Sequence, residues 1–251
     1  MVVYIVPLIA ITSLEKLNSY SNILSLDEFN YWHSILNPKF RREYFISKIL
    51  TRLFLSKYLN GTIAPKDLVF VKGEFGKPFL SPKFKALNVF FNVSHCDDLY
   101  TIAIGNRSIG VDVESYKFIA NDNLAEIVFS PSEMNKTLDM TAVEKNTFLV
   151  KTWTIKESYS KEMGLGVNIS FPLCSVEQLA NGFYNVSSDF KTNKDILIKN
   201  MTLIIKDVHY SLSISTHLKQ FSTLLIENID NENWCFKDDS FPLPSKISYT
   251  L

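Results

Sequence analysis

The stretch FLVKTWTIKESYSKEMGLG, residues 148–166, predicts a long helix that ends at glycines. Trp153, Glu157 and Lys161 are four residues apart, so they lie on one face of that helix. The glycines at its end favour a sharp stop and allow another chain segment or a ligand to approach closely. Two explanations fit this face: a solvated Glu–Lys pair beside a core aromatic residue, or a catalytic face that meets a phosphate.

Part of this pattern occurs a second time in the chain. Residues 45–61, FISKILTRLFLSKYLNG, share with residues 148–166 a Phe-x-x-Lys start, a Ser-Lys pair near the end and a closing glycine. The strand-like segments YTIAI at Tyr100 and YSLSI at Tyr210 also echo each other. A duplicated pair of α+β halves explains both echoes. We therefore expect an α+β pseudo-dimer with one half at residues 1–108 and the other at residues 109–251.

Composition limits the class of protein. The 251 residues are 46% hydrophobic and carry 26 basic and 26 acidic side chains, so the net charge is zero and a chain-wide grip on nucleic acid or anionic lipid is not expected. The three cysteines have neither disulfide-framework nor zinc-site spacing, which favours a reducing cytoplasm. The apolar N-terminus MVVYIVPLIAI is too short to span a bilayer and lacks a basic start, so it is interpreted as a buried strand.

Periodicity and turn residues place the remaining elements. We expect helices at 26–36 and 39–61, and a capped helix that begins at Ser130 with Glu133 as its capping partner. The segment 99–115 is expected to form a hairpin that turns at Gly105–Asn106. Strands are expected at 67–71, 89–94, 196–208 and 210–215, whereas the tail at 231–251 is expected to be irregular.

Paired carboxylates mark a candidate metal site. In IGVDVES, alternation along a strand puts Val111 and Val113 on one face and Asp112 and Glu114 on the other. Two carboxylates this close repel each other in a cleft unless a cation lies between them, and hard oxygen ligands suit Mg²⁺. Glu157 is a candidate third ligand or general base. The alternative is a strand whose polar face is simply solvated.

Other polar residues are candidates for phosphate contacts. In FNVSHCDD, Ser94 and His95 point in opposite directions along a strand, and either a phosphate contact or a structural cap fits them. Lys161 is placed to meet a phosphate oxygen and to keep Glu157 ionised. EFGKPF presents Lys77 and Pro78 on a rigid turn, and KFRREYF places Arg42 near the head of a helix; a solvated surface is the alternative for both.

The joint order of FGKPF, FNVSH, IGVDVES, FSPSE and WTIKESYSK resembles the 4'-phosphopantetheinyl transferase family, in its larger, Sfp-type (surfactin-synthetase-activating) branch. That resemblance spans roughly Arg42 to Gly166. It implies a pseudo-dimer of two α+β halves, with coenzyme A contacts in the first half and the metal site and catalytic helix in the second. It also implies Mg²⁺ as cofactor, coenzyme A as substrate and an apo acyl or peptidyl carrier protein as partner.

The resemblance also implies roles for individual residues. Asp112, Glu114 and Glu157 are similar to the family's Mg²⁺ ligands, Asp112, Glu157 and Lys161 to its catalytic group, and Arg42, Lys77, Pro78, Ser94, His95 and Lys161 to its coenzyme A contacts. The expected reaction moves 4'-phosphopantetheine to a carrier serine and releases adenosine 3',5'-bisphosphate, in a cytoplasmic monomer that binds neither nucleic acid nor membrane. Two rivals remain: an inactive homologue that binds coenzyme A or a carrier protein without transfer, and a metal-dependent phosphohydrolase.

Overall fold

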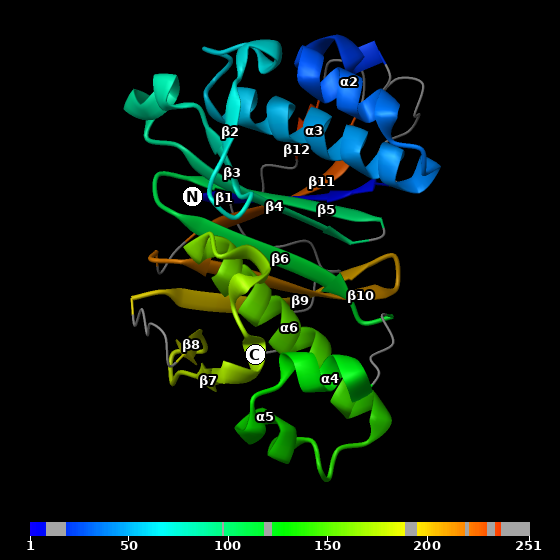
Figure 1. Cartoon of the computed structure of the whole chain (residues 1–251), viewed down its shortest axis with the longest axis vertical. Helices are drawn as coiled ribbons and strands as arrows, with labels where there is room; N and C mark the ends of the chain where they lie inside the picture. The colour runs from blue at the N-terminus through cyan, green and yellow to red at the C-terminus, as the bar shows by residue number, and fades with distance from the viewer. Residues whose placement is uncertain are drawn as a thin grey trace.

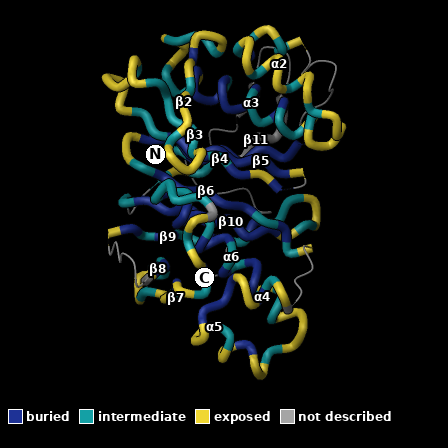
Figure 2. Tube along the Cα trace, in the orientation of Figure 1, coloured by how far each residue is buried: buried dark blue, intermediate teal, exposed yellow. Residues whose placement is uncertain are grey.

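Two five-stranded sheets are stacked on each other, with one long helix on the outer side of each sheet (Figure 1). This computed structural model describes residues 1–8, 19–96, 98–117, 122–188, 195–218, 221–229 and 234–236. Figure 2 shows that burial is concentrated in the strands and long helices, whereas α2, α4, α5 and the connecting loops carry most of the exposed residues. The chain therefore forms four layers in the order helix, sheet, sheet, helix.

The first sheet has the strand order β12-β11-β1-β5-β4. Its strands are β1 (Val2–Pro7), β4 (Phe90–Cys96), β5 (Leu99–Gly105), β11 (Ser222–Ile229) and β12 (Trp234–Phe236). Helix α3 (Pro38–Tyr58) covers its outer face, where side chains such as Tyr4, Ile49 and Ile102 form one hydrophobic core. Helix α2 (Leu26–Ser34) and the hairpin of β2 (Phe70–Lys72) and β3 (Pro78–Leu80) complete this side.

The second sheet has the strand order β6-β10-β9-β8-β7. Its strands are β6 (Ile109–Ser115), β7 (Cys174–Gln178), β8 (Tyr184–Ser188), β9 (Leu197–Ile205) and β10 (Val208–Thr216). Helix α6 (Ala142–Met163) lies on its outer face and ends at Gly164, whose φ of 70° is the left-handed conformation that glycine adopts easily. Helices α4 (Asp122–Val128) and α5 (Pro131–Lys136) precede α6, and α5 begins with the predicted capping box of Ser130 and Glu133.

The two halves repeat one topology. Along the chain, β1, α3, the β2–β3 hairpin, β4 and β5 correspond to β6, α6, the β7–β8 hairpin, β9 and β10. In space, the order β1-β5-β4 corresponds to β6-β10-β9, and all of these neighbours are antiparallel. The expected α+β pseudo-dimer is confirmed. The division at residue 108 stays a prediction, and β11, from the second half of the sequence, pairs in parallel with β1.

The sequence echo that suggested this repeat is not an aligned repeat. YTIAI and YSLSI do lie on corresponding strands, β5 and β10. However, Tyr100 belongs to the core beneath α3, whereas Tyr210 belongs to the core between the sheets. The two segments thus differ in register by an odd number of residues, because successive strand residues face opposite sides of a sheet.

The hairpin predicted at residues 99–115 is wrong. Strand β5 is already paired on both edges, with β1 and with β4, so it has no free edge for the next strand. The chain therefore crosses between the sheets after Gly105, and β6 pairs with β10 instead. The tail differs as well, because Trp234–Phe236 forms the edge strand β12 against β11; the rest of 231–251 lies outside the described residues.

The stacked sheets share a core of Val, Ile, Leu and Tyr side chains. Val111 and Val113 point into this core and are fully buried, which confirms the predicted alternation of β6. The N-terminal strand is also confirmed through Pro7. No helix in the described ranges combines the length and the apolar character needed to cross a bilayer.

Helix α6 meets its sheet through hydroxyl groups. The Thr154 hydroxyl lies 2.8 Å from that of Ser211 and accepts a hydrogen bond from Ser213, and the Ser158 hydroxyl lies 2.8 Å from that of Ser215. All five side chains are fully buried. Because such small side chains let the backbones approach, this contact brings the helix unusually close to the strands that carry the candidate site.

Gly110 lies directly against the backbone of α6. A Cβ atom at this position would lie 1.8 Å from the carbonyl oxygen of Ser158. We therefore expect Gly110→Ala to push α6 off β6 and to lower the free energy of unfolding by about 2 kcal/mol, as overpacking does. Urea unfolding measures this change. Gly105→Ala is the control, since its Cβ would meet only side-chain atoms at 3.1–3.2 Å; equal effects at the two glycines would contradict this account.

Candidate functional site

The acidic strand β6 and the helix α6 run in step. Two strand residues span about 6.7 Å and four helix residues about 6 Å, so side chains at these intervals remain opposite each other. Going up β6, Gly110 lies against the turn from Ser158 to Glu162, Asp112 lies near Glu157 and Lys161, and Glu114 lines a pocket with Trp153. The carboxylates of β6 therefore point at the helical face that the sequence predicted.

Asp112 is the centre of this arrangement. Its side chain is 4% exposed, and its Oδ1 accepts hydrogen bonds from Ser94 Oγ at 2.8 Å and from Lys161 Nζ at 2.5 Å. Its Oδ2 is buried and has no hydrogen-bond partner among the described residues. Leaving a buried carboxylate oxygen unpaired is unfavourable, so this atom marks a position that a donor or cation would satisfy.

Glu157 is the second carboxylate at this position. Burial raises the pKa of Glu157, the nearby charge of Asp112 raises it further, and Lys161 acts in the opposite direction. The coupling shows that the structure brings Glu157 and Asp112 together although 45 residues separate them in sequence. A carboxyl group with a raised pKa is also suited to accept a proton near neutral pH.

These two carboxylates fit a hard divalent cation. Mg²⁺ usually takes one or two protein carboxylates and completes its shell with water and substrate phosphates, and Asp112 Oδ2 is a free oxygen ligand. Within the described residues, no group of three His, Cys, Asp or Glu side chains is close enough to hold a metal ion, so Glu114 does not form a ready three-carboxylate cluster with Asp112 and Glu157. The residues therefore fit a site that is open to a phosphate ligand.

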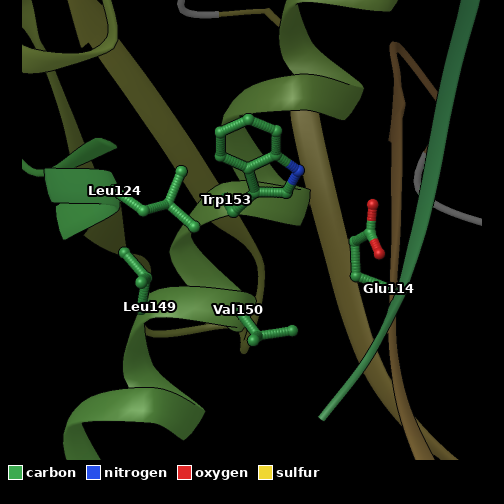
Figure 3. A pocket seen from close by; sticks show the side chains of 5 residues that line it. All are labelled: Glu114, Leu124, Leu149, Val150 and Trp153. Atoms are coloured by element: carbon green, nitrogen blue, oxygen red, sulfur yellow. The ribbon is translucent and has the colours of Figure 1, made fainter. Parts of the chain in front are cut away.

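Glu114 lies one step further along β6. Figure 3 shows its carboxylate and the Trp153 ring on opposite sides of a pocket that Leu124, Leu149 and Val150 also line. The pocket measures about 140 Å³, below the roughly 300–1,000 Å³ of drug-sized ligand pockets, so it does not enclose a whole nucleotide. Trp153 also packs edge-on against Phe171 at 5.9 Å. The structure thus places Glu114 on the predicted face, beside an apolar hollow.

Strand β4 brings residues of the first half to the same place. The β4 and β6 edges of the two sheets are joined by side chains, because Val111 N donates to Asn92 Oδ1 at 2.8 Å and Val113 N donates to Ser94 Oγ at 3.4 Å. Asn92 is a residue of this site that the sequence motifs did not predict. Its spacing of two from Ser94 in FNVSH puts both on one face, and that was the available signal.

His95 points to the other side of β4 from Ser94, as predicted, and is exposed. Partial burial of the ring lowers its pKa; the charges of Glu43 and Asp112 act in the opposite direction, and Lys161 lowers it further. His95 is thus within electrostatic reach of both Glu43 on α3 and the Asp112–Lys161 pair. Arg42, in the same part of α3, is exposed and has no hydrogen-bond or ion-pair partner within the described part of the chain.

The GKP turn contacts the end of α6. Lys77 Nζ donates to the carbonyl oxygens of Ile109 at 3.0 Å and Glu162 at 3.2 Å. Burial lowers the pKa of Lys77 to about 8, against the opposing charge of Glu162. Pro78 follows at the start of β3 and is half-buried. The structure therefore brings this turn to the seam between the two halves. There the Lys77 ammonium group is hydrogen-bonded to two backbone carbonyl groups.

Comparison with known proteins gives the class first. Residues 108–213 match the profile described as the 4'-phosphopantetheinyl transferase superfamily. This segment begins just before β6 and ends within β10, so it contains Asp112, Glu114, Glu157 and Lys161. The family resemblance inferred from the sequence motifs is thereby confirmed for this part of the chain.

Individual relatives are similar over a longer stretch of the chain. The chain is 30% identical over 152 residues to the 4'-phosphopantetheinyl transferase gsp of Aneurinibacillus migulanus, and the alignment covers 61% of each protein. It is 27% identical over 171 residues to the 4'-phosphopantetheinyl transferase Sfp of Bacillus subtilis, covering 63% of this chain and 74% of that protein. The chain thus matches less than two thirds of the length of gsp. A holo-(acyl-carrier-protein) synthase structure from Bacillus anthracis is 20% identical with a TM-score of 0.34, over 43% of this chain and 94% of that one.

Proposed function

We propose that this chain transfers the 4'-phosphopantetheine group from coenzyme A to a serine of an apo acyl or peptidyl carrier protein. The reaction depends on Mg²⁺ and releases adenosine 3',5'-bisphosphate. The proposal includes a cytoplasmic monomer. It is supported above all by the unpartnered, buried Oδ2 of Asp112, which lies beside a second carboxylate and a lysine in the segment that matches the transferase superfamily.

In this proposal, Asp112, Glu114 and Glu157 hold the metal. When bound, Mg²⁺ neutralises charge on the diphosphate of coenzyme A and helps to orient it. Asp112 Oδ2 and Glu157 are the stronger part of the assignment, because one is unpaired and the other is electrostatically coupled to it. Glu114 shares the β6 strand face of Asp112 but lies beside the apolar pocket, so it is the weaker part of the assignment.

The protein's own groups then handle the proton and the phosphate. The carrier serine oxygen forms a bond to the β-phosphorus of coenzyme A, the bond from that phosphorus to the oxygen bridging the α-phosphorus breaks, and the serine proton passes to Glu157 directly or through water. The Lys161 ammonium group donates hydrogen bonds to Asp112 and Ser94 at the seam, where it can also donate to a phosphate oxygen.

The first half supplies the remaining coenzyme A contacts in this proposal. Ser94 and His95 lie at the end of β4, with His95 assigned to the 3'-phosphate. Arg42 is exposed on α3 and free to contact an anion, and Lys77 and Pro78 form the turn beside the end of α6. Of these residues, Ser94 hydrogen-bonds to Val113 where β4 meets β6, and Lys77 hydrogen-bonds to Ile109 at the start of β6.

Intact-mass measurement tests the proposal. The protein is incubated with Mg²⁺, coenzyme A and each of several apo carrier domains of the acyl and peptidyl types. We expect at least one carrier to gain the mass of a phosphopantetheine group, and expect no gain when EDTA is present. Failure to modify any carrier, together with measurable coenzyme A binding by calorimetry, would favour the inactive homologue instead.

A further inference from the structure

Lys77 joins three segments of the chain at one point. It lies in the turn between β2 and β3, and its ammonium group reaches the carbonyl oxygens of Ile109 and Glu162. The turn also fits closely against the glycines that end α6. A Cβ at Gly164 would lie 3.7 Å from Lys77 Cδ, and a Cβ at Gly166 would lie 3.3 Å from the Phe75 carbonyl oxygen. This turn of the first half therefore interlocks with the end of α6.

The two carbonyl groups belong to the segments that carry the site. Ile109 is the first residue of β6, three residues before Asp112, and Glu162 directly follows Lys161 in α6. The Glu162 carbonyl also accepts a hydrogen bond from Ser108 Oγ at 2.9 Å. A cation at the C-terminal end of a helix is stabilised by the helix dipole. The Lys77 ammonium group of the first half thus hydrogen-bonds to both segments that form the Asp112–Lys161 contact, β6 and α6.

We propose that Lys77, in the first half, is a positioning residue. Its hydrogen bonds to the Ile109 and Glu162 carbonyl groups cross the seam between the two halves and hold Lys161 against Asp112 within the second half. The activity that it supports rests on the proposed function; the positioning itself does not. This inference replaces the coenzyme A contact assigned above to the Lys77 ammonium group with a positioning role through β6 and α6, and it leaves that contact to the rest of the turn with Pro78.

Electrostatics give this role a distinct pH dependence. The groups that face Lys77 are the two carbonyls and the carboxylate of Glu162, which is itself paired with His217 at 3.3 Å. Burial lowers the pKa of Lys77 from 10.5 to about 8. The folded state therefore binds fewer protons than the unfolded state between these values, and the contribution of Lys77 to stability rises with pH across this window. Turnover should fall across the same window, because the positioning ammonium group is lost.

The experiment compares Lys77→Met and Lys77→Arg with the wild type. Lys83→Met is the control, because Lys83 is an exposed lysine of the same half that stacks on Phe84. For Lys77→Met we expect kcat to fall about 10-fold, with KM for coenzyme A changed less than about 3-fold. Lys77→Arg should retain activity and lose the alkaline decline of kcat, since an arginine stays charged. Lys83→Met should match the wild type.

Hydrogen exchange of the ligand-free protein supplies a readout without turnover. We expect Lys77→Met to increase amide exchange at residues 109–113 and 161–165, and expect no such increase with Lys83→Met. Hydrogen exchange can be measured even if no carrier protein is modified. It therefore tests the positioning role of Lys77 independently of the proposed function. Unchanged exchange, or a KM for coenzyme A raised about 10-fold with kcat preserved, would overturn the positioning role; the latter would make Lys77 a direct contact.

Discussion

Asp112→Asn is expected to lower the rate of phosphopantetheine transfer by about 10²–10³-fold or more, because it removes the charged oxygen that the site leaves unpaired. The variant should fold normally. Asparagine keeps the size of the side chain and an oxygen for the Ser94 hydrogen bond, and it removes the repulsion between Asp112 and Glu157. Lys161 loses its ion-pair partner but is 27% exposed, so water can solvate it. We therefore expect an unfolding free energy equal to or above that of the wild type.

The measurement combines carrier modification by intact mass with urea unfolding of the same samples. Asp139→Asn is the matched control, since Asp139 is an exposed aspartate of the same half, between α5 and α6. It should leave both quantities unchanged. Normal transfer by Asp112→Asn would show that the metal assignment is wrong, and a large loss of stability would show that Asp112 is mainly structural.

The largest effect on stability is expected at the buried pair of Glu133 and Lys156. Lys156 is fully buried and donates to Glu133 Oε2 at 2.5 Å and to the carbonyl groups of Val128 and Phe171. Glu133 also accepts from the backbone nitrogens of Ser130 and Val176. The pair thus ties α4, α5, α6 and β7 together, directly beside Glu157 in sequence.

Removing one partner leaves the other charge buried. Glu133→Ala should therefore lower the free energy of unfolding by about 3–5 kcal/mol. Glu144→Gln is the control, because Glu144 forms the same kind of capping box at the exposed start of α6, and it should have little effect. In a double-mutant cycle, Glu133→Leu combined with Lys156→Met should recover much of the loss. Additive losses would contradict a coupled buried pair.

Much of the site could be predicted from short-range pattern. Alternation fixed the faces of β6, since Val111 and Val113 are core residues and Asp112 and Glu114 point to α6. Helical spacing likewise placed Glu157 and Lys161 on the side of α6 that meets Asp112. These inferences succeed because they depend only on the repeat of the backbone.

Long-range pairing could not be predicted in the same way. The local sequence around Gly105–Asn106 is typical of a hairpin turn, but both edges of β5 are paired, with β1 and with β4, and this pairing depends on the topology of the whole sheet. The sheet-facing side of α6 was similarly hidden, because it carries Thr154 and Ser158 where a hydrophobic stripe is normally expected. The hydrogen bonds of Lys77 could not be predicted either, because their acceptors lie in β6 and α6, far from Lys77 in sequence.

Binding of Mn²⁺, as a spectroscopic substitute for Mg²⁺, tests the metal site most directly. Electron paramagnetic resonance titration in the presence of coenzyme A follows the loss of the free-ion signal in the wild type, Asp112→Asn and Asp139→Asn. We expect one ion bound per chain in the wild type and in Asp139→Asn, with affinity in Asp112→Asn at least about 10-fold weaker. Equal affinity in all three proteins would mean that the ion does not sit on Asp112, and the proposed acidic centre at the seam would have to be abandoned.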